Sequence, residues 1–146
     1  MDDLPGSVLF ACSANSIRSP MAEAILKHLL GQRVYVDSVG VRAREIDGFA
    51  VAAMQEIGID VERHRSKAFD ELEDTSFDLV ITLSPEAQHR AVEMTRTMAC
   101  DVEFWNTLDP SIVDGTREMR LDAYRQVRDQ LMARIKARFP LPLKPV

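Results

Sequence analysis

Cysteine and histidine are scarce in this sequence: of 146 residues, two are cysteine and three are histidine. Cys12 and Cys100 stand far apart, without the short spacings that indicate a disulfide framework or a zinc site. We therefore expect no metal and no cofactor. Two unpaired thiols are typical of a reducing cytoplasm, which is the location we predict.

Long apolar runs and an excess of basic residues are also missing. No apolar stretch approaches the roughly 18 residues that a membrane span requires, and the start, MDDLPGS, carries acidic residues where a signal peptide carries basic ones. The net charge of −5 argues against nucleic acid as a partner, because nucleic-acid-binding domains usually present a basic face. The length favours one domain over residues 1–146. We expect neither a membrane nor a nucleic acid as a partner.

Apolar runs of strand length alternate with helical patterns along the chain. Strands are predicted at 7–12, 33–40, 77–83 and 100–105. Helices are predicted from Ser19 as N-cap with Pro20 as the first helical residue, at 47–58, from Ser84 as N-cap, and from Thr116. This alternation predicts an α/β fold with a parallel sheet covered on both faces. Ligands of such sheets bind at the carboxyl ends of the strands, where Cys12 stands.

The segment CSANSIR, residues 12–18, connects the first predicted strand to the first predicted helix. Backbone N–H groups in such a turn, together with the helix dipole, can converge on one anion. Arg18 adds a planar donor that fits two oxygens of a phosphate. The same positive potential favours the thiolate of Cys12, and a thiolate beneath a bound phosphate is an in-line nucleophile.

Two further residues suit this loop. Asn15 tolerates the left-handed backbone that a turn around an anion needs, and Ser19 can donate to the thiolate or cap the helix. The alternative for Cys12 is an inert buried thiol at a strand end. Neither the glycine-rich Gly-Lys-[Ser/Thr] loop nor the G-x-G-x-x-G fingerprint is present, so the sequence favours a phosphate site without a nucleotide.

Cleavage of a phosphomonoester also requires a proton for the leaving oxygen. Asp109 follows a predicted strand and precedes Pro110, which stiffens the loop, and Asp101 and Asp114 are the other candidates. None of the three histidines stands in a loop that has to face the site; these are His28, His64 and His89.

The stretch VLFACSANSIRSPMAEAIL, residues 8–26, resembles the opening of the low-molecular-weight protein tyrosine phosphatases and the related arsenate reductases. The resemblance continues through VDSVG, AAMQEIGIDVERHRSK, FDLVITLSPE and the LDP before the last helix. It implies a three-layer flavodoxin-like α/β fold with a four-stranded parallel sheet. It also implies that Cys12 is the nucleophile and that Asp109 is the general acid, then the base that activates water against a phosphocysteine.

The resemblance further implies that the phosphate is bound by Arg18 and the loop amides, and that Asn15 and Ser19 shape the loop. The phosphate-binding residues would be Ser13, Ala14, Asn15, Ser16, Ile17 and Arg18. The expected substrate is a phosphorylated protein or a small aryl phosphate, with phosphate, sulfate or arsenate as the bound oxyanion. We expect a monomer or a weak dimer.

Several residues depart from the family pattern. Ala14 stands where family loops often carry glycine, and Ile17 where the eukaryotic-type phosphatases place a second cysteine. Ser111 follows Asp-Pro where an aromatic residue often stacks on phosphotyrosine. The loop VRAREIDGF lacks the usual aromatic wall, a place that Arg42, Arg44 or Phe49 would have to fill. A preference for phosphotyrosine is therefore not predicted.

Arsenate reduction is the main alternative activity. Thioredoxin-coupled reductases use a cysteine pair just after the third strand, where TLSPEAQHRAVEM has Ser84 and no cysteine. We expect Cys100 to be a buried residue at a strand start, so only a reductase that uses an external thiol remains. A third interpretation is a catalytically silent module that binds anions or phosphoproteins. The basic segments at Arg42/Arg44 and 63–67 have two interpretations: they flank the mouth of the site and attract acidic substrates, or they are solvated surface, which is slightly favoured.

Overall fold

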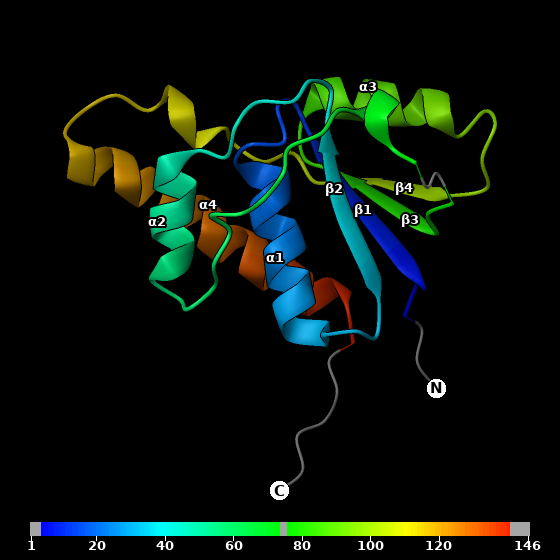
Figure 1. The fold of residues 1–146 in the computed structure, drawn as a ribbon, viewed down its shortest axis with the longest axis horizontal. Coiled ribbons are helices and arrows are strands. Elements are labelled where there is room, and N and C mark those ends of the chain that lie inside the picture. Colours follow the sequence, from blue (N-terminus) through cyan, green and yellow to red (C-terminus); the bar gives the residue numbers. More distant parts are fainter. Residues whose placement is uncertain (1–3, 74–75, 141–146) are drawn as a thin grey trace, which may run out of the picture.

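The computed structural model describes residues 4–73 and 76–140. Four strands form one sheet, in which every neighbouring pair is parallel and the order is β2-β1-β3-β4 (Figure 1). The strands are β1 (Ser7–Cys12), β2 (Tyr35–Gly40), β3 (Leu79–Thr82) and β4 (Asp101–Phe104). All four predicted strands are confirmed, although the last three are shorter than the apolar runs that predicted them.

Four α-helices and two short 3-10 turns complete the described chain. They are α1 (Arg18–Leu30), α2 (Gly48–Gln55), α3 (Pro85–Met94), α4 (Arg117–Arg138), η1 (Phe69–Glu71) and η2 (Pro110–Ile112). The predicted cap Ser84 is confirmed, because its hydroxyl accepts a hydrogen bond at the start of α3. The hydroxyl of Thr116 accepts one in the same way at the start of α4. Such caps satisfy backbone N–H groups that have no partner within the helix.

The predicted cap of the first helix is wrong. Helix α1 already begins at Arg18, and Ile17 occupies the cap position without a side-chain hydrogen bond. Ser19 lies inside the helix, and its hydroxyl contacts Cys12 and Asn15 instead of a helix N–H. Pro20 is tolerated in this first turn because N–H groups there lack intrahelical partners.

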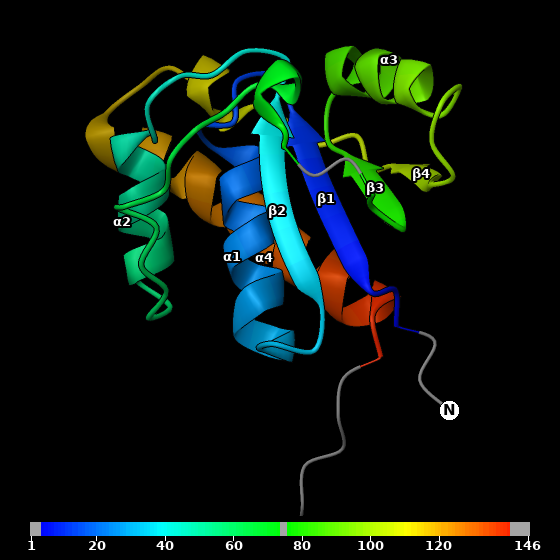
Figure 2. The same cartoon turned by 45° about the vertical axis from the view of Figure 1, so that its right-hand side comes forward.

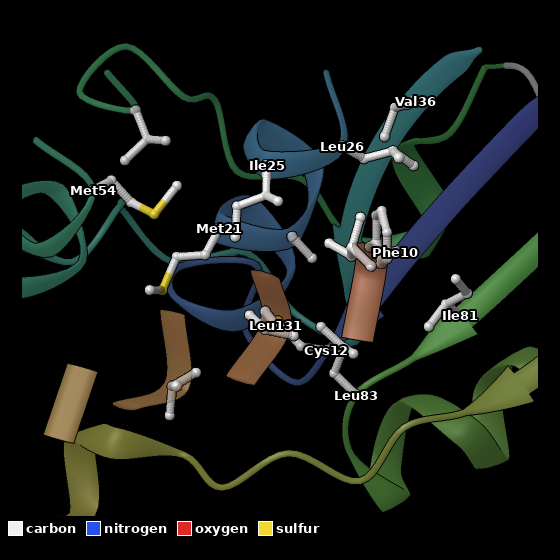
Figure 3. Close-up of a cluster of buried hydrophobic side chains, with 14 of the residues drawn as sticks. Phe10, Cys12, Met21, Ile25, Leu26, Val36, Met54, Ile81, Leu83 and Leu131 are labelled. Carbon is white, nitrogen blue, oxygen red and sulfur yellow. The ribbon is translucent and has the colours of Figure 1, made fainter. Parts of the chain in front are cut away.

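Helices cover both faces of the sheet, as Figure 2 shows. Successive residues of a strand point to opposite faces, so Phe10 of β1 packs in a core with α1, α2 and α4, whereas Leu9 packs in a second core with α3. Cys12 belongs to the first core and lies at its edge near Leu83 (Figure 3). The predicted three-layer α/β arrangement is confirmed.

The strand order places a crevice at the carboxyl end of β1. The chain runs from β1 through α1 to β2 on one side, whereas β3 pairs with β1 on the other side. Ligands of open parallel sheets bind where the connections diverge in this way, and Cys12 is the last residue of β1. Within residues 4–73 and 76–140, no helix has both the length and the apolar character needed to cross a membrane.

Candidate active site

The carbonyl groups of the loop that follows β1 are occupied by the segment that follows β2. Four backbone N–H groups of residues 41–47 donate to carbonyl oxygens of residues 12–16, at N···O distances of 2.9–3.0 Å. The pairs are Val41 to Cys12, Arg42 to Ser13, Arg44 to Ala14 and Asp47 to Ser16. The N–H groups of residues 13, 14, 16 and 17 donate to no other described residue. A loop with occupied carbonyls and unused amides is suited to an anion.

Gly40 allows the two segments to approach this closely. A Cβ atom at this position would lie 2.4 Å from the carbonyl oxygen of Arg42 and 2.6 Å from the backbone nitrogen of Asn15. Any larger residue would push the loop away from β2. The glycine that ends VDSVG is therefore part of the construction of the loop.

Asn15 is the most extensively hydrogen-bonded residue of the loop. Its backbone is left-handed, with φ of 51°, and its fully buried amide uses all its hydrogen-bonding capacity. The oxygen Oδ1 accepts from the backbone N–H of Lys67 at 2.9 Å and lies 3.0 Å from Nε2 of His64. The nitrogen Nδ2 donates to the hydroxyls of Ser19 at 2.8 Å and Ser38 at 3.0 Å.

The sulfur of Cys12 has two hydrogen-bond partners. The backbone N–H of Asn15 donates to Sγ at 3.3 Å, and Oγ of Ser19 lies 2.9 Å from Sγ. Because Ser19 already accepts a hydrogen bond from Asn15, its own proton is available to the sulfur. Both partners can donate a hydrogen bond to the sulfur, and such bonds are stronger when the acceptor is charged.

A polar shell continues outward from Asn15. Ser38 donates to Glu23 at 2.5 Å, and Ser66 donates to the backbone carbonyl of Asn15 at 2.7 Å. Burial is the main cause that lowers the pKa of His64, so its ring is neutral near pH 7 and Nε2–H donates to Asn15. The interpretation of the basic segments as solvated surface is wrong for the residues of 63–67 that contact Asn15. It is also wrong for Arg42 and Arg44, which line the pocket.

The guanidinium of Arg18 is anchored by the segment that follows β4. It donates to the carbonyl of Thr107 at 2.9 Å, and Arg18 is only 8% exposed. Thr107 follows β4, so a third strand end contributes to the site. The remaining guanidinium N–H groups are left to bind an anion in the geometry that suits phosphate.

Asp109 is the aspartate among the three candidates that lines the pocket. Its Oδ1 accepts from the backbone N–H of Ser111 at 2.9 Å and from the Ser111 hydroxyl at 2.7 Å. Oδ2 accepts no hydrogen bond from any described residue, so this oxygen is left for contact with a bound substrate. Asp101 begins β4 at the opposite, amino edge of the sheet, and Asp114 does not line the pocket.

These residues surround a pocket of about 290 Å³. Its lining consists of Cys12, Ser13, Ala14, Ser16, Ile17, Arg18, Arg42, Arg44, Glu45, Asp47, Asp109 and Ser111. No aromatic side chain of the described residues is part of this lining. Phe49, a candidate for the missing wall, instead packs on Tyr124, with ring centroids 5.2 Å apart, and beneath the guanidinium of Arg120.

Asp47 was not predicted as a site residue. It caps α2 through Oδ1, and its Oδ2 accepts a hydrogen bond from the hydroxyl of Tyr124 at 3.1 Å. Burial and the nearby Asp47 raise the pKa of Tyr124, which keeps its proton and donates. The capping position Asp47-Gly48 is readable from sequence, but the contact to Tyr124 depends on the packing of α2 against α4.

Cys100 lies far from Cys12. It precedes β4 at the amino end of the strands. Along the strand direction, about five residues or about 16 Å separate it from Cys12, whereas a disulfide needs Cα atoms within about 7 Å. Cys100 is only partly buried, not buried as predicted, and this partial burial raises the pKa of its thiol. Among the residues that the structure describes, no group of three histidine, cysteine or carboxylate side chains could hold a metal ion.

A buried cysteine beneath a loop whose unused amides suit an anion, at the carboxyl end of a parallel sheet, is typical of enzymes with a thiolate nucleophile. The family model "low molecular weight phosphotyrosine protein phosphatase" matches residues 7–139. The chain therefore belongs to this family, and its fold is the flavodoxin-like one predicted. Its relatives include both hydrolases and reductases.

Three similar proteins illustrate this range. An arsenate reductase of Bacillus subtilis is 36% identical over 129 residues, which cover 88% of this chain and 91% of the relative. The structure of an arsenate reductase in its oxidised state has a TM-score of 0.76 at 28% identity, covering 90% of this chain and 95% of that one. The YwlE arginine phosphatase, solved as a mutant with a phosphorylated active-site serine, has a TM-score of 0.72 at 28% identity, covering 89% and 91%.

Proposed function

We propose that the protein hydrolyses phosphomonoesters in two steps through a phosphocysteine. The observation that carries this proposal is the position of Cys12, whose sulfur accepts two hydrogen bonds in a pocket that is also lined by Arg18 and Asp109. A nucleophile, an anion-binding loop and an acid in one pocket are what this chemistry requires.

In the first step, the thiolate of Cys12 attacks phosphorus while Arg18 and the loop amides hold the non-bridging oxygens. The bond from phosphorus to the leaving oxygen breaks, and Asp109 gives its proton to that oxygen. In the second step, a water molecule attacks phosphorus and gives a proton to Asp109. The S–P bond breaks, inorganic phosphate forms, and the departing thiolate is stabilised by the hydroxyl of Ser19.

The proposed substrates are a phosphorylated protein side chain or a small aryl phosphate, with phosphate, sulfate or arsenate binding as free oxyanions. Solved relatives include an arsenate reductase in a phosphate-binding state, which supports an oxyanion in this loop. The location proposed is the cytoplasm, because the nucleophilic thiol has to stay reduced.

Arsenate reduction is a less suitable activity for this chain. Arsenate fits the same loop, but a reductase must transfer the resulting oxidation from Cys12 to a second thiol. Within the described residues the other cysteine is Cys100, which lies at the opposite, amino end of the strands. Arsenate reduction would therefore depend on an external thiol.

A phosphorylated guanidino group is a second candidate substrate class. Three carboxylates line the pocket, from Glu45, Asp47 and Asp109, and no described aromatic side chain does. Carboxylates accept paired hydrogen bonds from a guanidinium, whereas an aromatic leaving group gains most from stacking on a ring. The similar protein YwlE is an arginine phosphatase, which supports this class.

The test is phosphate release without added metal, between pH 5 and 8, from p-nitrophenyl phosphate and from phosphoarginine. We expect Cys12→Ser to abolish turnover and to retain phosphate binding. Faster release from phosphoarginine than from the aryl phosphate would support the second class. Turnover by Cys12→Ser at the wild-type rate would exclude Cys12 as nucleophile. If the folded wild type releases no phosphate but reduces arsenate when an external thiol is added, thiol-dependent arsenate reduction replaces the proposal.

A further inference from the structure

Arg42 lies beside the anion site but is not used by the proposed mechanism. Its backbone N–H donates to the carbonyl of Ser13 at 2.9 Å, which fixes its Cα against the loop. Its side chain lines the same pocket as Cys12 and Arg18. The guanidinium donates to both carboxylate oxygens of Glu86, at 2.9 and 3.2 Å.

Glu86 is held next to the loop by the start of α3. It is the second residue of that helix, and the cap residue Ser84 accepts a hydrogen bond from the hydroxyl of Ser13 at 3.1 Å. The hydrogen bond from Arg42 lowers the pKa of Glu86, and Ser13 and Arg18 act in the same direction. The carboxylate is therefore negatively charged near pH 7 and lies within the electrostatic field of the phosphate site.

The pair between Arg42 and Glu86 is easily broken. The two side chains are 50% and 47% exposed, and exposed ion pairs contribute little to stability because water and salt screen them. A phosphate dianion in the loop carries two charges, against one on Glu86. Because Arg42 lines the pocket, a bound phosphate attracts its guanidinium more strongly than Glu86 does.

We propose that Arg42 is a second anion-binding arm of the site, and that Glu86 competes with the bound phosphate for it. Glu86 lowers the affinity for the anion in two ways, because it occupies Arg42 and because its own charge repels a dianion. This inference rests on the proposed function, since it assumes that the loop binds phosphate.

The experiment measures the dissociation constant of inorganic phosphate by calorimetry in the Cys12→Ser background, where no turnover interferes. We expect Glu86→Gln to tighten binding about fivefold and Arg42→Ala to weaken it about fivefold, the size of one charge interaction close to water. With Arg42→Ala already present, Glu86→Gln should have a smaller effect. Salt at 1 M should reduce all these differences.

The chain offers a matched control on the same helix. Arg90 of α3 forms a comparable ion pair with Asp70, at 3.0 Å, and neither residue lines the pocket. Asp70→Asn and Arg90→Ala should leave phosphate binding unchanged. If Glu86→Gln or Arg42→Ala, folded as judged by thermal melting, binds phosphate within about twofold of the parent, the inference is overturned and the proposed function stands. If the Cys12→Ser parent binds no phosphate, both fail.

Discussion

Replacing Ser19 by alanine removes one of the two hydrogen bonds that reach the sulfur of Cys12. The hydroxyl lies 2.9 Å from Sγ, and 3.3 Å from the carbonyl of Val39, the other group to which it can donate. A hydrogen bond to a charged group is worth about 1.5–3 kcal/mol. Because 1.36 kcal/mol corresponds to tenfold in a rate, the loss corresponds to about 10- to 100-fold.

The loss should fall on the second chemical step. In that step the thiolate leaves phosphorus, and the hydroxyl of Ser19 stabilises the departing negative charge. In the first step the thiolate is the nucleophile, and a thiolate that is less stabilised attacks phosphorus at least as readily. We therefore expect Ser19→Ala to accumulate phosphocysteine, with a rapid burst of p-nitrophenol equal to the enzyme concentration and then slow turnover. Rapid-mixing kinetics measures both phases.

Ser38→Ala is the matched control for this variant. Both substitutions remove one acceptor of the Asn15 amide, but Ser38 makes no contact with the sulfur. If the hydroxyl acts directly on the thiolate, Ser38→Ala should lose much less steady-state activity and show no burst. Equal losses in the two variants, or wild-type turnover in Ser19→Ala, would refute the argument and leave Ser19 as a support of the loop only.

Two further variants test the acid and the loop. Asp109→Asn should slow the cleavage of aryl phosphates and flatten the pH profile of kcat/KM, while substrates with better leaving groups lose less. An unchanged profile would exclude Asp109 as the acid and point to another carboxylate of the pocket, Glu45 or Asp47. Gly40→Ala should lower the free energy of unfolding by about 1–3 kcal/mol, the usual cost of overpacking, since its Cβ would lie within 3 Å of three backbone atoms. Calorimetry measures the melting temperature, and an unchanged value would show that the loop moves aside without cost.

Local patterns predicted the parts of the site that are built from neighbouring residues. The apolar run ending at Cys12 and the helical pattern after Arg18 defined the strand, the loop and the helix. The expected left-handed backbone of Asn15 is present as well. These features depend on interactions within a few residues, so the sequence contains the information for them.

The partners of Asn15 were not predicted, because they come from distant segments. Ser38, His64 and Lys67 stand 23, 49 and 52 residues further along the chain. Nothing local distinguishes a histidine that donates to a buried amide from one on the surface. The composition of residues 63–67 favours solvated loop, and the tertiary structure overrides that preference for three of the five residues.

Position after the carboxyl end of a predicted strand is a sequence feature that indicates further site residues. In a parallel sheet, the segments that follow all strands meet at that end of the sheet. Arg42 follows β2, Glu86 follows β3, and Thr107 and Asp109 follow β4. Listing the polar residues just after each predicted strand would have brought all four to the site, although it would not have paired Arg42 with Glu86.

The net charge of −5 is compatible with a site for anions because the relevant field is local. Unused loop amides, Arg18 and the start of α1 would act within a few ångströms of an anion in the loop, whereas exposed carboxylates elsewhere are screened. A hydrolase must also release phosphate, its own product, so maximal affinity for the dianion would slow turnover. A carboxylate such as Glu86, held beside the loop and paired with a cation of the pocket, limits that affinity without touching the nucleophile. Removing it should therefore tighten phosphate binding and make product inhibition stronger.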